Sequence, residues 1–311
     1  DAIRRRISVL SDFAWERRVK WEMVLRWADN FDGRAGLTKE EEQFQALYLL
    51  SQFLYFGSRE IRVLLQAIYR DLYLIPLVQE MRATLSGSRD GLALRAAVEQ
   101  ALNRTRFLGV GNPSESGVHL LYFFRQENGL SKSHFLDSAQ ILERHNGAIR
   151  LRHPAVDRYV FVDDVCGSGE TATRYSRDFL GEVMALNPTA KLFYFAMFGT
   201  TDGMEVVRQH TLFGSNALAV YELDKTYKCL SQDSRYLKAV PFGVSPALVR
   251  QVARFYGQLI MPAHPHGYQD SELLLGFHHN TPDNTIPIIW ADQTNGSPIP
   301  WTPAFRRYQK I

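Results

Sequence analysis

The chain has 311 residues, enough for about two domains. Hydrophobic residues make up 45% and charged residues 22%, as in ordinary globular proteins, which excludes a disordered or fibrous chain. The 36 basic and 33 acidic residues leave a net charge of +3, which argues against nucleic acid as the main ligand. With two cysteines, no signal peptide and no apolar run of 18 residues, the chain is expected to be cytoplasmic and not to contact a membrane.

The first hundred residues show helical spacing. Apolar side chains four residues apart predict a helix that ends near residues 30–33: Trp15, Val19, Met23 and Trp27. Thr38 and Glu41 have the spacing of a capping box, which begins the next helix. Its expected buried stripe comprises Phe44, Leu47, Leu50 and Leu54.

Two more helices are predicted before residue 104. One starts at Gly57-Ser58 and ends or kinks at Pro76, because proline cannot donate an amide hydrogen bond. Its expected inward residues are Ile61, Leu65, Ile68, Leu72 and Ile75. The other covers residues 91–103.

Strands and helices alternate from residue 104 onward. Strands are expected at 105–110, 158–162, 191–198 and 217–222, and helices at 118–125, 169–186, 202–209 and 246–260. Such alternation is typical of an α/β fold with a parallel sheet covered by helices on both faces. We therefore expect a helical region over 1–104, an α/β core over 105–260 and a proline-rich tail over 261–311.

One segment carries the chemistry. In the run YVFVDDVCGSGET (159–171), a buried strand leads to Asp163 and Asp164, then to a glycine-containing loop and a helix. Ligands of open parallel sheets bind at the carboxyl ends of the strands, and a helix N-terminus attracts anions. Carboxylates would repel a phosphate unless they hold ribose hydroxyls or a metal ion. The segment therefore predicts a sugar-phosphate site.

Three common motifs do not fit this segment. A Walker loop would need glycine where Asp164 stands and lysine where Glu170 stands. A nucleophile elbow would need glycine at Cys166 and Glu170. A dinucleotide fingerprint would place its glycines before the acidic residues.

The segment resembles the phosphoribosyl pyrophosphate motif of type I phosphoribosyltransferases, with Gly167 and Ser168 at positions where threonine is commoner. The resemblance implies a Rossmann-like phosphoribosyltransferase fold. It also implies that Asp163 and Asp164 hold the ribose and, through the substrate, magnesium. The implied 5′-phosphate loop is Cys166, Gly167, Ser168, Gly169, Glu170 and Thr171. The alternative is a solvated acidic turn between strand and helix.

The same family has an earlier loop that binds pyrophosphate. Residues 111–117 occupy the matching place, and their candidate ligands are Ser114, Glu115, Ser116 and Gly117. An ordinary polar turn is the alternative. Residues 131–157 stand where the family has a mobile loop, with Arg144, Arg150 and Arg152 as candidate pyrophosphate ligands or solvated side chains.

A narrower resemblance spans most of the chain. It rests on Phe56-Gly57-Ser58, on PSESGVH (113–119), on VDDVCGSG (162–169) and on HNTPDNTIPIIW (279–290). These segments are similar to phosphoribosyltransferase-like proteins of bacterial conflict and anti-phage operons, including some beside retron reverse transcriptases. The resemblance implies a toxic effector and a protein complex with defence partners, with nucleic acid reached only through such a partner.

The tail is the candidate for a hood over the acceptor base. Phe277 and Trp290 could stack on a base and Asn280 could read its edge, although a simply packed tail fits equally well. Four histidines there do not have zinc-ligand spacing, so packing or substrate contact is favoured for them: His264, His266, His278 and His279.

Two accounts of function follow. In the first, an enzyme binds magnesium phosphoribosyl pyrophosphate or a nucleotide, and transfers the phosphoribosyl group or hydrolyses the glycosidic bond. In the second, an inactive relative senses nucleotides with the same pocket and docks to a partner such as a retron complex. The acceptor base is not predicted by the sequence.

Overall fold

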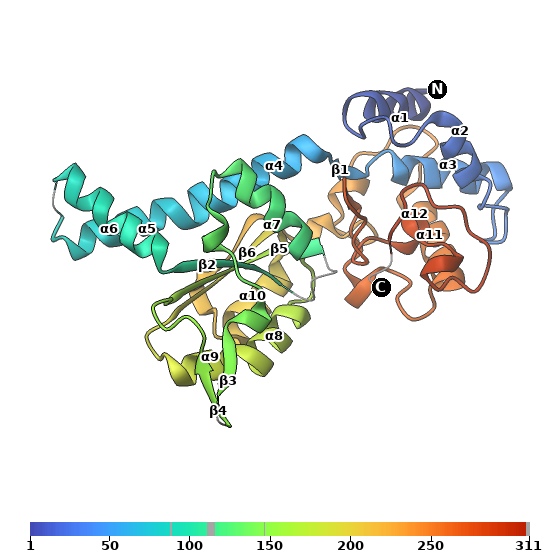
Figure 1. Ribbon diagram of the computed structural model, residues 1–311. Helices are drawn as coiled ribbons and strands as arrows, with labels where there is room; N and C mark the ends of the chain where they lie inside the picture. Colours follow the sequence, from blue (N-terminus) through green and yellow to red (C-terminus); the bar gives the residue numbers. More distant parts are fainter. Residues whose placement is uncertain (88, 111–115, 146, 309–311) are drawn as a thin grey trace. The chain divides into compact units, whose positions relative to one another are not determined.

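The computed structural model describes residues 1–87, 89–110, 116–145 and 147–308 and has a mixed α/β fold (Figure 1). The chain forms two compact units. Unit 1 combines residues 1–61 with 223–311, and unit 2 comprises residues 62–222. In the described part of the chain, no helix is long and apolar enough to span a bilayer.

Unit 1 is built from both ends of the chain around one hydrophobic core. Phe305 stacks on Phe53 with ring centroids 4.3 Å apart and meets the edge of Trp15 at 5.1 Å. The Trp27 indole donates a 2.7 Å hydrogen bond to the Ile288 carbonyl. The main elements of unit 1 are α1 (Ala2–Phe13), α2 (Trp21–Ala28), α3 (Lys39–Leu50), β1 (Leu54–Phe56), α11 (Pro246–Ile260), β8 (Leu275–Phe277) and α12 (Pro287–Trp290).

Unit 2 contains a four-stranded sheet in the order β2-β5-β6-β7, in which β5 runs parallel to both β2 and β6. The strands are β2 (Thr105–Gly109), β5 (Arg158–Cys166), β6 (Lys191–Thr200) and β7 (Ala217–Leu223, its last residue in unit 1). The helices are α4 (Ser58–Ala67, which starts in unit 1), α5 (Ile75–Thr84), α6 (Gly91–Asn103), α7 (Ser116–Glu127), α8 (Glu170–Tyr175), α9 (Gly181–Leu186) and α10 (Thr201–His210). The expected parallel pairing of the segments near 105, 158 and 191 is confirmed.

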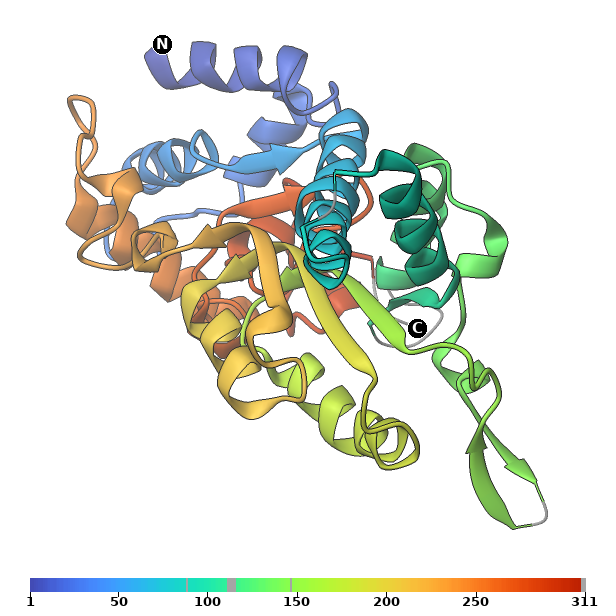
Figure 2. The ribbon, with the colours of Figure 1, turned by 90° about the vertical axis from the view of Figure 1, so that its left-hand side faces the viewer.

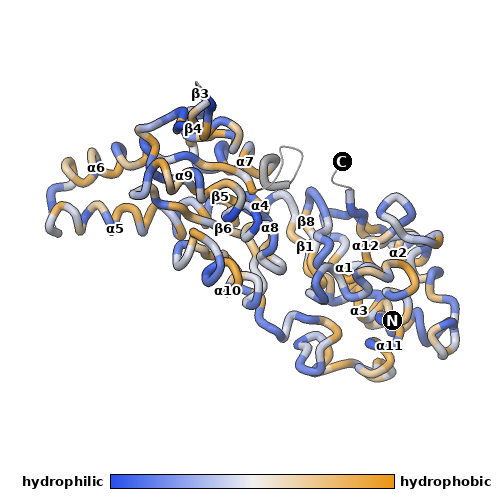
Figure 3. The backbone as a smooth tube through the Cα atoms, turned by 90° about the horizontal axis from the view of Figure 1, so that it is seen from below, coloured by the Kyte–Doolittle hydropathy of each residue, from blue (hydrophilic) through white to orange (hydrophobic). Residues whose placement is uncertain are grey.

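Helices cover both faces of this sheet (Figure 2). On one face Phe161 and Tyr194 pack in a cluster with residues of α8, α9 and α10. On the other, Tyr73 contacts the rings of Phe107 and Phe193 at 5.4 and 5.5 Å. The strands between them, β5 and β6, are hydrophobic over most of their length, and their middle residues are buried (Figure 3).

The predicted helix from Trp15 to Trp27 is wrong in its first half. The structure has α2 over Trp21–Ala28, preceded by an irregular turn. Glu16 and Arg17 have φ values of 50° and 57°, a left-handed backbone that a continuing helix cannot contain. Trp15 and Val19 are nevertheless buried, so their apolar spacing reflects the core rather than one helical face.

Two predicted stripes are also partly wrong. In α3 the Thr38–Glu41 capping box is confirmed, but Phe44 is only partly buried and Leu54 lies in β1. After α4 a π-helical segment over Ile68–Leu74 adds an extra residue per turn. This turns the helix so that Tyr73 and Leu77 are buried, whereas Ile75 is 46% exposed.

The expected mobile loop at 131–157 contains ordered secondary structure. Short 3₁₀ turns at Lys132–His134 and Ser138–Gln140 precede an antiparallel hairpin of β3 (Leu142–His145) and β4 (Ala148–Leu151). The hairpin projects from unit 2 (Figures 1 and 2). Further 3₁₀ turns lie at Gly214–Asn216, Lys225–Tyr227, Arg235–Leu237, Tyr268–Asp270 and Gln293–Asn295, and a second π segment at Ser176–Leu180.

The two compact units do not begin and end at the expected boundaries, which are residues 104 and 260. The physical reason is the shared core: α11 packs on α3, and Phe31 meets Tyr256 at 5.0 Å. The tail after residue 260 therefore belongs with the first helices, while α5 and α6 belong with the sheet.

Candidate functional site

The paired acids lie within the last residues of β5 rather than after it, since the strand continues to Cys166. Four fully buried residues lead to them: Tyr159, Val160, Phe161 and Val162. Because β5 is a central strand with parallel neighbours on both sides, its carboxyl end is at the sheet edge where ligands of parallel sheets bind.

The Asp163 carboxylate is directed into the protein. Its Oδ2 accepts a 2.7 Å hydrogen bond from the Tyr194 hydroxyl, and its Oδ1 accepts one of 2.9 Å from the Asp164 amide. Burial, reinforced by the neighbouring Asp164 carboxylate, raises the pKa of Asp163 well above its ordinary value, although the bond from Tyr194 opposes this. Both of its oxygens are thus engaged by the chain itself.

Asp164 is partly buried, and its Oδ1 accepts a 2.8 Å hydrogen bond from the Val165 amide. Asp164 lies one residue beyond Asp163 towards the carboxyl end of β5 and stays a candidate ligand for a ribose hydroxyl. Asp163 is therefore hydrogen-bonded within the protein, and the ribose and magnesium roles of both acids stay predictions.

Residues 167–169 form the turn between β5 and α8, and α10 packs directly beneath it. Gly169 has φ 76° and begins α8. The Thr200 hydroxyl donates a 2.5 Å hydrogen bond to the Gly167 carbonyl and accepts one of 3.0 Å from the Gly203 amide. A Cβ on Gly203 would lie 2.1 Å from the Gly167 oxygen. The turn is therefore held in place by a close backbone approach.

The remaining predicted phosphate ligands differ in exposure. Glu170 and Thr171 are exposed in the first turn of α8, and the Ser168 hydroxyl accepts a 3.3 Å bond from the Glu170 amide. Cys166 is buried, and burial raises the pKa of its thiol to about 12, so the thiol stays protonated. Its side chain packs in the core, and its place in the phosphate loop stays a prediction.

The predicted pyrophosphate loop is only partly described. Ser114 and Glu115 lie outside the described residues, while Ser116 and Gly117 begin α7 directly after them. Of the hairpin arginines, Arg150 and Arg152 pair with Glu143, at 2.6 and 3.5 Å. Arg144 is exposed on β3.

The three tail residues proposed to contact a base are not brought together. Phe277 and Asn280 line one cavity of unit 1, whereas Trp290 lines another and donates its indole N–H to the Thr285 carbonyl at 2.7 Å. The Asn280 carboxamide is bonded to the backbone of Tyr308, at 3.2 Å to its carbonyl and 2.9 Å from its amide. The hood role of residues 261–311 stays a prediction.

Within the described ranges, no cluster of three or more metal-ligating side chains is present. When Mg²⁺ binds together with a substrate phosphate, one or two carboxylates usually hold the ion along with the phosphates and water. The Asp164 carboxylate at the end of β5 fits that mode. A bound magnesium ion would neutralise charge on a pyrophosphate leaving group.

The sequence model of the PRTase-CE family matches residues 24–307. The chain is similar to the solved structure of Helicobacter pylori xanthine-guanine-hypoxanthine phosphoribosyltransferase, with 12% sequence identity and a TM-score of 0.25. The match covers 55% of this chain and 88% of the Helicobacter pylori chain. The search of curated proteins finds no match.

Proposed function

The chain belongs to the PRTase-CE family, and we propose that this phosphoribosyltransferase-like protein binds magnesium phosphoribosyl pyrophosphate, or a nucleotide, at the carboxyl end of β5. The observation that carries the proposal is the placement of Asp164 and the turn at 167–169 at the end of a central parallel strand. The carboxylate would hold a ribose hydroxyl, and the turn and the start of α8 would hold the 5′-phosphate.

The proposed reaction is substitution at ribose C1. In transfer, the bond from C1 to the pyrophosphate oxygen breaks, pyrophosphate leaves with the electron pair, and a base nitrogen forms a bond to C1 and gives up its proton. In hydrolysis of a nucleotide, the bond from C1 to the base nitrogen breaks instead, the base leaves with the electron pair, and a water oxygen forms a bond to C1 while a proton of that water passes to the departing base. Asp164 would orient the ribose while positive charge develops on the ring.

The test is isothermal titration of the full chain with magnesium phosphoribosyl pyrophosphate, followed by an assay for pyrophosphate release with each common nucleobase. Asp164→Asn is expected to weaken binding by about tenfold or more, since it removes a charged hydrogen-bond acceptor. Glu182→Gln is the matched control, because Glu182 is an exposed carboxylate on α9 of the same unit. If wild type does not bind, or if both variants bind equally, the proposal is wrong.

A specific observation favours the second account, a sensor without transfer. Both oxygens of Asp163 accept hydrogen bonds within the chain, from the Tyr194 hydroxyl and the Asp164 amide, which leaves this carboxyl less able to bind a substrate. Binding of phosphoribosyl pyrophosphate without release of pyrophosphate, whichever base is supplied, would support the sensor over the enzyme.

We further propose that the biological setting is the anti-phage effector role implied by the resemblance of residues 56–58, 113–119, 162–169 and 279–290. Expression in a bacterial host is then expected to slow growth and change nucleotide pools, and Asp164→Asn is expected to relieve both effects. Equal growth of cells expressing wild type and this variant would contradict the effector role while leaving ligand binding as a separate question.

A further inference from the structure

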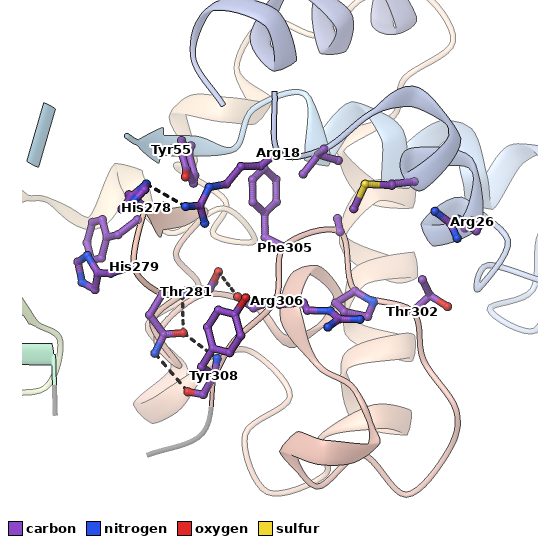
Figure 4. Close-up of a pocket in the computed structure, with 16 residues that line it drawn as sticks. Arg18, Arg26, Tyr55, His278, His279, Thr281, Thr302, Phe305, Arg306 and Tyr308 are labelled. Carbon is purple, nitrogen blue, oxygen red and sulfur yellow. Dashed lines mark hydrogen bonds between the residues drawn. The ribbon is translucent and has the colours of Figure 1, made fainter. Parts of the chain in front are cut away.

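A cavity of about 410 Å³ in unit 1 is lined by Tyr55 of β1, by residues 277–281 at the end of β8 and by residues 302–306 (Figure 4). These strands pair in parallel, with Phe56 opposite Phe277, and the His278 amide continues the ladder to the Phe56 carbonyl at 2.8 Å. Residues after both strands therefore gather at one edge, as at other ligand sites of parallel strands. Of these residues, those at 278–281 line the cavity, and those at 56–58 lie beside them.

The segment 56–58 is organised around one carboxylate. Glu16 accepts hydrogen bonds from the Ser58 amide at 2.8 Å and from the Ser58 hydroxyl at 2.7 Å, and contacts His278 Nδ1 at 2.9 Å. A Cβ on Gly57 would lie 2.8 Å from a Glu16 oxygen, so glycine is needed for this approach. Glu16 thereby holds His278, one of the cavity-lining residues, in position.

The charge of the cavity is one-sided. Among the described residues, its lining includes three arginines, Arg18, Arg26 and Arg306, and no aspartate or glutamate. The Arg18 guanidinium lies 3.8 Å from the Glu16 carboxylate and 2.9 Å from His278 Nδ1. In the described part of the chain, neither Arg26 nor Arg306 forms an ion pair with a carboxylate. Guanidinium groups without a carboxylate partner suit a phosphate.

An aromatic ring is presented beside these charges. Tyr308 is 61% exposed, yet its backbone is bonded on both sides by the Asn280 carboxamide. The neighbouring Arg307 is bonded to the Thr281 carbonyl at 2.7 Å and to Asp283 at 2.8 Å. Arg306 and Tyr308 line this cavity, whereas Arg307 between them lines the other one.

We propose that this cavity is a second ligand site, separate from the turn after β5, that binds a nucleoside phosphate. The arginines would pair with the phosphate, and Tyr308 would stack on the base. Its volume lies in the range of small-molecule pockets. A bare phosphate would leave the aromatic wall unused, and an uncharged nucleoside would leave the guanidinium groups without a partner.

The test measures binding of adenosine 5′-monophosphate to the full chain, with adenosine and inorganic phosphate as separate probes. The nucleotide is expected to bind at least tenfold more tightly than either probe. Arg306→Gln is expected to weaken nucleotide binding about three- to tenfold, and Tyr308→Ala by about fivefold or more. Arg5→Gln is the matched control, because Arg5 is an exposed arginine of the same unit outside the cavity.

Two further measurements locate the ligand. Hydrogen exchange with bound nucleotide is expected to slow at 277–281 and 304–308. The double variant Asp163→Asn/Asp164→Asn is expected to retain this protection, which separates failure of this site from failure of the proposed function. If the nucleotide does not bind, if Arg306→Gln and Tyr308→Ala bind like Arg5→Gln, or if protection appears only after β5 and vanishes in the double variant, the second site is refuted.

Discussion

Replacing Gly203 by alanine tests the close backbone approach beneath the candidate phosphate turn. The added Cβ would lie 2.1 Å from the Gly167 oxygen, 2.8 Å from its carbonyl carbon and 2.9 Å from the Thr200 hydroxyl. Two of these contacts are with backbone atoms, so a side-chain rotation cannot relieve them. Either α10 or the turn must shift, and the hydrogen bond from Thr200 to Gly167 is then weakened.

The magnitude follows from three contributions. Overpacking costs about 1–3 kcal/mol, and the weakened hydrogen bond costs about 1 kcal/mol. The gain in helix propensity from glycine to alanine returns about 0.5–1 kcal/mol. We expect a net loss of about 2 kcal/mol, which for a domain of this size lowers the melting temperature by about 4–8 °C.

Gly181→Ala is the matched control, since Gly181 also lies in a helix of unit 2 but a Cβ there meets nothing within 4 Å. It is expected to be neutral or slightly stabilising. Thermal unfolding of wild type and both variants is compared, together with titration of magnesium phosphoribosyl pyrophosphate. If Gly203→Ala matches Gly181→Ala in melting temperature, the reasoning about this contact is refuted.

Three other predictions concern single side chains. Because burial raises the pKa of Asp163, the folded state favours its protonated form, and its contribution to stability falls as pH rises from about 4 through that raised pKa. The melting temperature of Asp163→Asn should therefore rise relative to that of wild type as the pH increases from 5 to 8. A difference in melting temperature that stays constant over this range would contradict the reasoning. Asn280→Ala should speed hydrogen exchange at Tyr308 without affecting the amides of β5, and unchanged exchange would argue against the hydrogen bonds between Asn280 and the Tyr308 backbone. Thr38→Ala should cost about 1 kcal/mol in urea unfolding, whereas Thr38→Ser should cost little; equal losses would exclude the cap.

Local patterns in the sequence predicted much of unit 2. Apolar runs located β5 and β6, and the helix from 91 to 103 was predicted with its exact bounds. The predicted buried stripe was wrong after Ile68 because the prediction assumes a constant number of residues per helical turn. The π-helical segment changes that number. The helix predicted to begin at Trp15 was wrong because neither Glu16 nor Arg17 is a residue type that indicates the left-handed backbone found there.

The candidate sites divide in the same way. The paired acids were found because strand, acids, turn and helix are contiguous in the sequence. The bond from Tyr194 to Asp163 was not foreseen, since it depends on the register between β5 and β6. The cavity of unit 1 was missed because it depends on the pairing of β1 with β8, which lie near opposite ends of the chain. The available signal was the glycine of Phe56-Gly57-Ser58.

The interrupted course of unit 1 has a consequence for biosynthesis. A ribosome delivers all of residues 62–222 before it delivers Phe305, whose ring stacks on Phe53 and meets Trp15. Unit 2 can fold while the apolar surfaces of the N-terminal helices are still exposed, because the residues that cover those surfaces are translated last. Termination of translation a few codons before Phe305 would thus destabilise the helices at the N-terminal end of the chain.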